Sequence, residues 1–228
     1  MKSRGTGMLA VVILSTAALP AAESARNRLA DAADVFSEIM ATPDKGIPQD
    51  LLGKAQCVVI VPESKRVAFV VGGEYGKGFV ECRKNGGTGW GPPAAISVKG
   101  GSVGFQIGAS ATDVVMLVMN QRGMDKLNNS KFTLGADATV AAGPVGRSAD
   151  AKTDAYMTAE ILSWSRSKGL FAGVALNGAT LRPDMDANKE LYGTRLNTKE
   201  VLSGESHPPE EGTKLVAALD KYSMRKEN

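Results

Sequence analysis

The stretch LGADATVAAGPVGR, Leu134–Arg147, decides the fold together with a second stretch of the same character, SKGLFAGVALNGATL, at Ser167–Leu181. Both consist of small and apolar residues interrupted by glycines. Glycine inside an extended segment marks a bulge, a sharp bend or the close approach of another backbone, because it has no Cβ and tolerates positive φ. We therefore predict that the two stretches lie at the tightly packed centre of the fold.

Outward from these stretches, the chain has the hydrophobic patterns of a strand-rich domain flanked by helices. Short apolar runs predict strands at 57–61, 67–71, 78–83, 102–107 and 114–119, and we expect Pro62–Arg66 to form a hairpin turn between the first two. Helical periodicity is present near both ends, at 24–40, 48–54, 186–191 and 209–222. No repeating βαβ order is present, so we predict an α+β fold with a strand-rich antiparallel core, an N-terminal amphipathic helix and C-terminal helices.

The first 22 residues have the composition of an export signal. Lys2 and Arg4 precede the apolar run Met8–Leu14, and small residues follow as far as Ala22. This run is short for a membrane-spanning helix, so we predict a cleaved signal peptide at 1–22 and a single domain at 23–228. The protein is then expected to be periplasmic or secreted, with peripheral attachment to a membrane as a further expectation. The whole chain has 27 basic and 24 acidic residues, and removal of the leader with its two basic residues makes the two numbers nearly equal. This balance gives no reason to expect nucleic acid as a partner.

The segment Ser24–Met40 is predicted to be an amphipathic helix with two alternative roles. Leu29 and Phe36 lie on its apolar side, and Arg26 and Arg28 lie near its start. In the first interpretation the apolar side docks on the domain core. In the second it enters a lipid interface, where the two arginines meet phosphates while Leu29 and Phe36 reach the acyl boundary.

The residues that commonly carry catalysis or bind metals are scarce. A single histidine, His207, and two cysteines cannot supply the usual zinc site or a nucleophile–histidine pair. Cys57 and Cys82 fall on neighbouring predicted strands. A disulfide in an oxidising compartment is one interpretation, and two buried thiols packed as small hydrophobes is the one that we favour. The glycine clusters at 72–78 and 100–104 lack the lysine and hydroxyl ending of a phosphate-binding loop, so we interpret them as turns.

Several separated motifs resemble one known family. GADATVAAGPVGR followed by SKGLFAGVALNG resembles the SYLF domain family, a lipid-binding and actin-binding module, and the match places this chain as a bacterial secreted member. IPQDLLGKAQCVVIVP, GKGFVECR, GWGPPAAISVKGGSVGFQIGA and LYG follow in the order that the family shows. The resemblance implies binding of phosphoinositide-like headgroups, partly through an N-terminal amphipathic segment.

The predicted function is non-catalytic binding of anionic phospholipids at a membrane surface, without a cofactor or a metal. The predicted lipid-binding residues are Arg26, Arg28, Leu29, Phe36, Arg147 and Lys168. Other basic residues, among them Lys65, Arg66, Lys77, Arg83 and Lys84, are candidates for a phosphate-binding surface formed by loops. Actin is not expected as a partner, because the actin-binding relatives are cytosolic. The alternative functions are an envelope assembly protein that binds another protein and a hydrolase that depends on Asp113 or Asp137.

Overall fold

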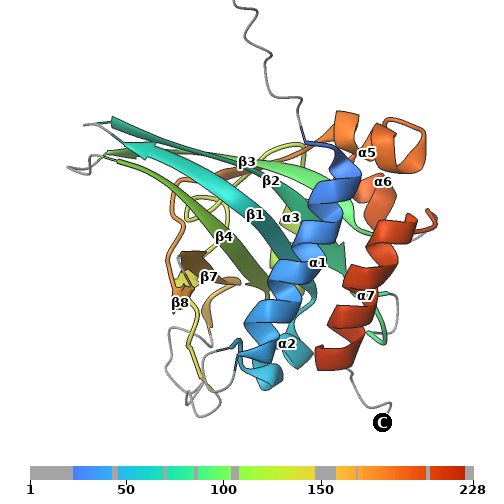
Figure 1. Cartoon of the computed structure of the whole chain (residues 1–228), viewed down its shortest axis with the longest axis horizontal. Helices are drawn as coiled ribbons and strands as arrows, with labels where there is room; N and C mark the ends of the chain where they lie inside the picture. The colour runs from blue at the N-terminus through green and yellow to red at the C-terminus, as the bar shows by residue number, and fades with distance from the viewer. Residues whose placement is uncertain are drawn as a thin grey trace, which may run out of the picture.

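A mixed sheet whose two longest helices cover one face forms the centre of the computed structural model, which describes residues 23–42, 46–68, 71–84, 87–103, 108–146, 158–167, 169–203 and 206–223 (Figure 1). Its strands follow the order β5-β9-β3-β2-β1-β4-β7-β6, and β8 pairs with β7. The strands are β1 (Cys57–Ala68), β2 (Val71–Cys82), β3 (Ala94–Val103), β4 (Gly108–Val118), β5 (Phe132–Thr133), β6 (Val140–Ala142), β7 (Ile161–Ser167), β8 (Leu170–Gly173) and β9 (Thr180–Pro183). The helices are α1 (Ala25–Ala41), α2 (Gln49–Lys54), α3 (Gln121–Leu127), α5 (Met185–Tyr192), α6 (Thr198–Leu202) and α7 (Glu210–Ser223). The predicted α+β class is confirmed.

The four longest strands extend well beyond the helices on one side of the molecule (Figure 1). We call this extension the sheet arm and define it as residues 64–68 of β1, 71–77 of β2, 97–103 of β3 and 108–112 of β4. The strands β1 to β4 pair antiparallel along their length. The arm therefore presents a broad two-sided surface that the helices leave uncovered.

The predicted hairpin turn at Pro62–Arg66 is wrong, because β1 continues through it. The pairing of β1 shifts register between Ile60 and Lys65 with β2 and between Val61 and Ser64 with β4, which is a β-bulge. Glu63 has a positive φ of 46° there, and its backbone N–H donates to Asp113 Oδ1 at 3.1 Å. The proline and polar residues that suggested a turn therefore accommodate an extra residue in a continuous strand.

The two glycine-rich stretches are tightly packed against each other, as predicted, but they lie at the end of the sheet formed by β6, β7 and β8, so the predicted position at the centre of the fold is wrong. A Cβ on Gly143 would lie 2.0 Å from Trp164 Cε2, and a Cβ on Gly173 would lie 2.0 Å from the carbonyl oxygen of Gly143. Trp164 is fully buried, and its Nε1 donates to the carbonyl of Pro144 at 2.9 Å. Glycine is needed at both positions because a backbone and a tryptophan ring occupy the space of a side chain.

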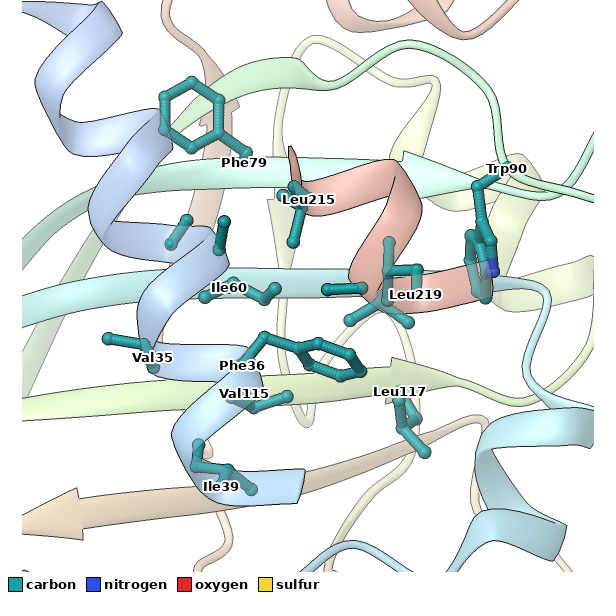
Figure 2. Close-up of a cluster of buried hydrophobic side chains, with 14 of the residues drawn as sticks. Val35, Phe36, Ile39, Ile60, Phe79, Trp90, Val115, Leu117, Leu215 and Leu219 are labelled. Carbon is teal, nitrogen blue, oxygen red and sulfur yellow. The ribbon is translucent and has the colours of Figure 1, made fainter. Parts of the chain in front are cut away.

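The main core lies between the sheet and the helices α1 and α7 (Figure 2). Phe36 and Ile39 project from α1 and Leu219 from α7 onto Ile60 and Val115 of the sheet (Figure 2). Full burial of each such side chain stabilises the fold by roughly 1.5–3 kcal/mol relative to exposure. A second core covers the opposite face of the sheet beneath β5, α3 and α6, and it includes Phe132, Leu134 and Val201. The long strands are thus covered on both faces, and on the face of the second core this cover extends over Ser64 and Val98 of the sheet arm.

The two cysteines form a disulfide, so the favoured expectation of free thiols is wrong. Cys57 and Cys82 stand directly opposite each other on β1 and β2, with an S–S distance of 2.01 Å. Both side chains are buried in the second core. The antiparallel register places the two residues side by side, a relationship that their 25-residue separation in sequence does not reveal.

Candidate functional site: a basic face on the sheet arm

Basic and aromatic side chains lie in a row across the helix-bearing side of the sheet arm. Register pairs Lys65 of β1 with Tyr75 of β2, and Tyr75 with Lys99 of β3. Residues paired in this way project from the same side of a sheet. Tyr75 is 45% exposed, and Lys99 Nζ lies 5.8 Å from the centroid of its ring.

Two further cations border this row. Lys77 follows Tyr75 by two positions on β2, and Arg182 of β9 pairs with Ser97, which precedes Lys99 by two positions on β3. Alternation along a strand therefore places both on the same side as the row. We call the set Lys65, Tyr75, Lys77, Lys99 and Arg182 the basic face. Within the described part of the chain, Lys65, Lys99 and Arg182 form no ion pair.

A shallow hollow of about 310 Å³ lies where the basic face meets the start of α5. Lys77 Nζ lies 2.7 Å from Asp184 Oδ2 at this border, and Asp184 also caps α5 by accepting from the backbone N–H of Ala187. Burial alone would raise the pKa of Asp184, but the hydrogen bonds from Lys77 and Ala187 outweigh it and lower that pKa. Asp184 therefore stays ionised and fixes the position of Lys77.

An acidic cleft of about 630 Å³ lies on the same face of the sheet as the basic face but nearer to the first helix, between α1 and the bulged part of β1. Its carboxylates are Asp31, Asp34 and Glu38 of α1, Glu63 of β1 and Asp113 of β4. Arg166 of β7 also lines it, donating from Nε to Asp113 Oδ2 at 2.9 Å and forming an ion pair with Glu38. The helix-bearing side of the arm is thus positive toward β9 and negative toward α1.

The predicted lipid-binding residues of the first helix make contacts with other parts of the protein. Leu29 and Phe36 are fully buried against the sheet, and Arg28 is only 7% exposed. Arg26 remains partly exposed, but its Nη1 lies 3.0 Å from Glu211 Oε2 of α7. The helix is docked, as the first interpretation has it, because its apolar side covers the core. In this arrangement Leu29 and Phe36 are not accessible to a membrane.

The remaining predicted residues divide between several places. Arg147 and Lys168 lie outside the described residues. Arg66 projects to the other side of the arm, where its Nη2 lies 2.8 Å from Glu74 Oε2. Arg83 binds the carbonyl groups of Leu52, Gly53, Ala55 and Ser223, which close the C-terminal ends of α2 and α7. Of the basic residues that the sequence singled out, Lys65 and Lys77 are therefore the two that the described structure brings to the basic face.

Sequence reasoning missed Tyr75, Lys99 and Arg182 as members of this surface. They lie on three different strands, and only the register shows that they are neighbours. The one signal in the sequence was local: Tyr75 and Lys77 alternate with glycines, which is the pattern of an exposed strand side. The interpretation of the cluster 72–78 as a turn is therefore wrong, because β2 runs through it.

The residues proposed for catalysis have structural partners. Asp113 binds Arg166 and the backbone N–H of Glu63, and Asp137 Oδ2 accepts from the backbone N–H of Thr133 at 2.7 Å. Among the described residues no three histidine, cysteine, aspartate or glutamate side chains are grouped to hold a metal ion. None of the helices in the described ranges is long and apolar enough to span a membrane.

Comparison with known proteins identifies the family and corrects one expectation. Residues 99–222, more than half of the chain, match the family model described as "Ysc84: Las17-binding protein actin regulator". The chain is 34% identical over 180 residues to "LAS seventeen-binding protein 3" of Saccharomyces cerevisiae, covering 78% of this chain and 39% of that protein. It is 32% identical over 196 residues to "SH3 domain-containing YSC84-like protein 1" of Homo sapiens, covering 85% of this chain and 57% of that protein.

A third relative, "SH3 domain-containing protein PJ696.02" of Schizosaccharomyces pombe, is 36% identical over 177 residues, or 76% of this chain and 41% of that protein. The chain thus spans between about two fifths and three fifths of the length of these relatives. Their names and the family description denote binding and regulatory proteins. The expectation that excluded actin is contradicted, because the family is described by its regulation of actin. The resemblance to the SYLF family is confirmed, and the chain belongs to the Ysc84 family.

Proposed function

We propose that this chain is a non-catalytic binding protein whose basic face binds anionic phospholipid headgroups. The observation that carries the proposal is the cross-strand row Lys65–Tyr75–Lys99, which joins two cations and an exposed aromatic ring on one uncovered sheet surface. An extended sheet surface contacts a membrane over a broader area than a single loop does. Tyrosine suits the boundary between headgroups and acyl chains because its ring is apolar and its hydroxyl is polar.

Electrostatics gives the expected size and orientation of the interaction. A basic residue close to an anionic membrane contributes about 1 kcal/mol, so Lys65, Lys99 and Arg182 together contribute about 3 kcal/mol. The acidic cleft beside α1 is repelled by the same membrane. The two halves of the surface therefore orient the molecule with β3 and β9 toward the headgroups and α1 away from them.

Co-sedimentation with vesicles tests this proposal. The purified chain is mixed with neutral phosphatidylcholine vesicles and with vesicles that also contain phosphatidylglycerol, across a series of salt concentrations. Binding is expected with the anionic vesicles alone and is expected to weaken as salt screens the charges. A triple variant with Lys65→Gln, Lys99→Gln and Arg182→Gln should bind roughly 100-fold more weakly, the equivalent of about 3 kcal/mol.

A matched triple variant separates the site from net charge. Lys54→Gln, Lys84→Gln and Lys221→Gln remove the same charge from exposed lysines near the ends of α2, β2 and α7, at the opposite end of the long strands from the sheet arm. This variant should bind within about twofold of the unsubstituted chain, because charges more than a Debye length of ~10 Å from the membrane are screened. Equal weakening of the two triple variants would show that overall charge, and not the basic face, drives binding.

A protein partner is the second candidate, because the family is described as a Las17-binding actin regulator. The basic face also suits an acidic protein surface, since lysine and arginine pair with carboxylates as they do with phosphates. Co-sedimentation with actin filaments, using the same two triple variants, tests this alternative. Binding to filaments that depends on the basic face, without binding to vesicles, would make the protein partner the primary function.

We also propose that the chain is exported. The leader-like composition of Met1–Ala22 supports this, and the Cys57–Cys82 disulfide suits an oxidising compartment. N-terminal sequencing of the protein recovered from cells tests it. A mature N-terminus within the small residues that precede Glu23 is expected, and an uncleaved Met1 would contradict export by a cleaved leader.

A further inference from the structure

The hollow between the basic face and the start of α5 is lined by charged groups of both signs. These are Lys77 of β2, Lys99 of β3, Asp184 and Asp186 at the start of α5, and Arg195 beyond its end. The volume of about 310 Å³ equals that of roughly ten water molecules, which suits one small polar group. The hollow therefore has the size and the charges of a site for a single headgroup.

Two of the cations in the hollow are held by carboxylates, and the third is not. Lys77 Nζ lies 2.7 Å from Asp184 Oδ2. Arg195 Nη2 lies 3.0 Å from Asp186 Oδ1. Lys99 has no carboxylate partner in the ranges that the structure describes. Three positive and two negative groups leave one net positive charge, so the hollow matches a group with a single negative charge.

The two carboxylates restrict what else the bound group can carry. The side chain of Asp184 is only 9% exposed and is held by Lys77, whereas that of Asp186 is 80% exposed and remains accessible to a ligand. An ionised carboxylate accepts hydrogen bonds and donates none. A hydroxyl group can therefore donate to Asp186, whereas a second phosphate or a carboxylate would be repelled by it. This chemistry favours a singly charged group that carries hydroxyls.

Two exposed apolar side chains lie beside these charges. Tyr75 is 45% exposed and Met185 is 38% exposed, and both line the hollow. A free phosphate ion would leave both side chains in water. An anionic headgroup that is still joined to its acyl chains would cover them, because such a lipid places apolar groups next to its phosphate. The apolar border therefore favours a lipid over a small soluble anion.

We propose that the hollow holds the headgroup of one anionic phospholipid, a singly charged phosphodiester that carries hydroxyl groups. Lys99 binds the phosphate, Asp186 accepts a hydrogen bond from a headgroup hydroxyl, and Tyr75 and Met185 contact the region where the acyl chains begin. Asp186 is then the residue that determines headgroup specificity. This inference rests on the proposed function and goes beyond it, because the charge of the basic face alone does not distinguish headgroups of equal charge.

Vesicles that differ only in their headgroup hydroxyls test the proposal. Phosphatidylglycerol and phosphatidylethanol are both phosphodiesters with one negative charge, and only the first carries hydroxyls on its headgroup. Each lipid is mixed into phosphatidylcholine vesicles at the same mole fraction, and co-sedimentation of the purified chain is measured at one salt concentration. Binding to phosphatidylglycerol should be about tenfold tighter, because a hydrogen bond to a charged acceptor contributes about that factor.

Asp186→Ala removes the hydrogen-bond acceptor and should bring the two affinities within about twofold of each other. Because the variant also removes a negative charge, both lipids should bind more tightly, and the ratio of the two affinities is the readout. Asp50→Ala is the matched control. Asp50 is exposed and is the second residue of α2, as Asp186 is of α5, and α2 lies far from α5 (Figure 1). The control should keep the tenfold preference.

Met185→Ser tests the apolar part of the site. It should weaken binding to phosphatidylglycerol vesicles about threefold, and this loss should persist at high salt, because burial of apolar surface is not screened. The loss caused by Lys99→Gln should instead shrink as salt rises. Soluble glycerophosphoglycerol, which is the same headgroup without acyl chains, should not displace the chain from vesicles at matching concentrations. Far-ultraviolet circular dichroism establishes that each variant is folded.

The possible failures of the two proposals differ. Equal affinity of the unsubstituted chain for the two anionic lipids would overturn the headgroup proposal and leave lipid binding by the basic face intact. A preference that Asp186→Ala leaves unchanged would do the same. Displacement by glycerophosphoglycerol at matching concentrations would refute the role of the acyl chains. Binding to neither kind of vesicle would remove the proposed function and the headgroup inference together.

Discussion

Replacing Gly143 by alanine should destabilise the protein strongly. The added Cβ would lie 2.0 Å from Trp164 Cε2 and 2.1 Å from Cζ2, where carbon atoms normally stay about 3.5–4.0 Å apart. The ring cannot move aside, because it is stacked on Phe171 and its Nε1 donates to Pro144. Overpacking a rigid site costs about 1–3 kcal/mol, and the rigidity of the ring favours a value of about 3 kcal/mol.

Urea unfolding followed by tryptophan fluorescence measures this change. Both tryptophans of the chain, Trp90 and Trp164, are buried, so their emission shifts to longer wavelength on unfolding. A loss of about 3 kcal/mol corresponds to a fall in melting temperature of about 6–12 °C for a domain of this size. Gly53→Ala is the matched control, since a Cβ on this residue of α2 meets nothing within 4 Å and alanine favours helix.

The control should unfold at the same urea concentration as the unsubstituted chain or a higher one. A Gly143→Ala variant whose free energy of unfolding lies within about 0.5 kcal/mol of the unsubstituted chain would refute the close-packing argument. If the slope of the free energy of unfolding against urea concentration is unchanged in both variants, the difference between them reflects stability and not a change in the unfolded ensemble.

Two further predictions concern charged groups beneath the helices. Burial raises the pKa of the Glu81 carboxyl well above its usual value of 4.5, and the charge of Asp220 adds to this, so the folded protein holds the proton that the unfolded chain releases. The contribution of Glu81 to stability should therefore be greatest below about pH 4.5, and it should fall as pH rises toward the pKa of Glu81 in the folded protein. Glu81→Gln should remove this dependence of stability on pH in unfolding experiments from pH 4 to 9. Arg83→Ala should lower the free energy of unfolding by about 2–4 kcal/mol, because several buried carbonyl groups lose their charged donor, whereas Lys84→Ala should change it by less than about 0.5 kcal/mol.

Local patterns were sufficient for the helices near both ends of the chain, except α6, and for the tight packing of the glycine-rich stretches. The first helix was predicted over 24–40 and is observed over Ala25–Ala41, because its apolar residues recur with helical spacing and Ser24 caps its start. The tight packing of the glycine-rich stretches was predicted in the same way, since glycine in an extended segment marks the close approach of a neighbour, but the neighbour itself, Trp164, was not predicted. Such signals lie within a few residues of each other in the sequence.

Register and long-range pairing could not be read from local patterns. The segment Pro62–Arg66 looked like a turn because proline and polar residues commonly end strands, and only its neighbours on both sides keep it extended. The Cys57–Cys82 disulfide and the row Lys65–Tyr75–Lys99 depend on which strands are adjacent. A candidate site assembled from three strands is therefore visible only once the sheet order is known.

The docking of α1 against the last helix has a consequence for biosynthesis. Arg26 forms its ion pair with Glu211, 185 residues later, and the backbone N–H of Ala25 donates to Glu190. At a synthesis rate of about 5–20 residues per second, the first helix leaves the ribosome roughly 10–40 s before the helix that covers it. During that interval Leu29, Phe36 and Ile39 lack the contacts that α7 supplies. We therefore expect a truncation before α7 to leave part of the apolar side of α1 exposed and to give an insoluble product.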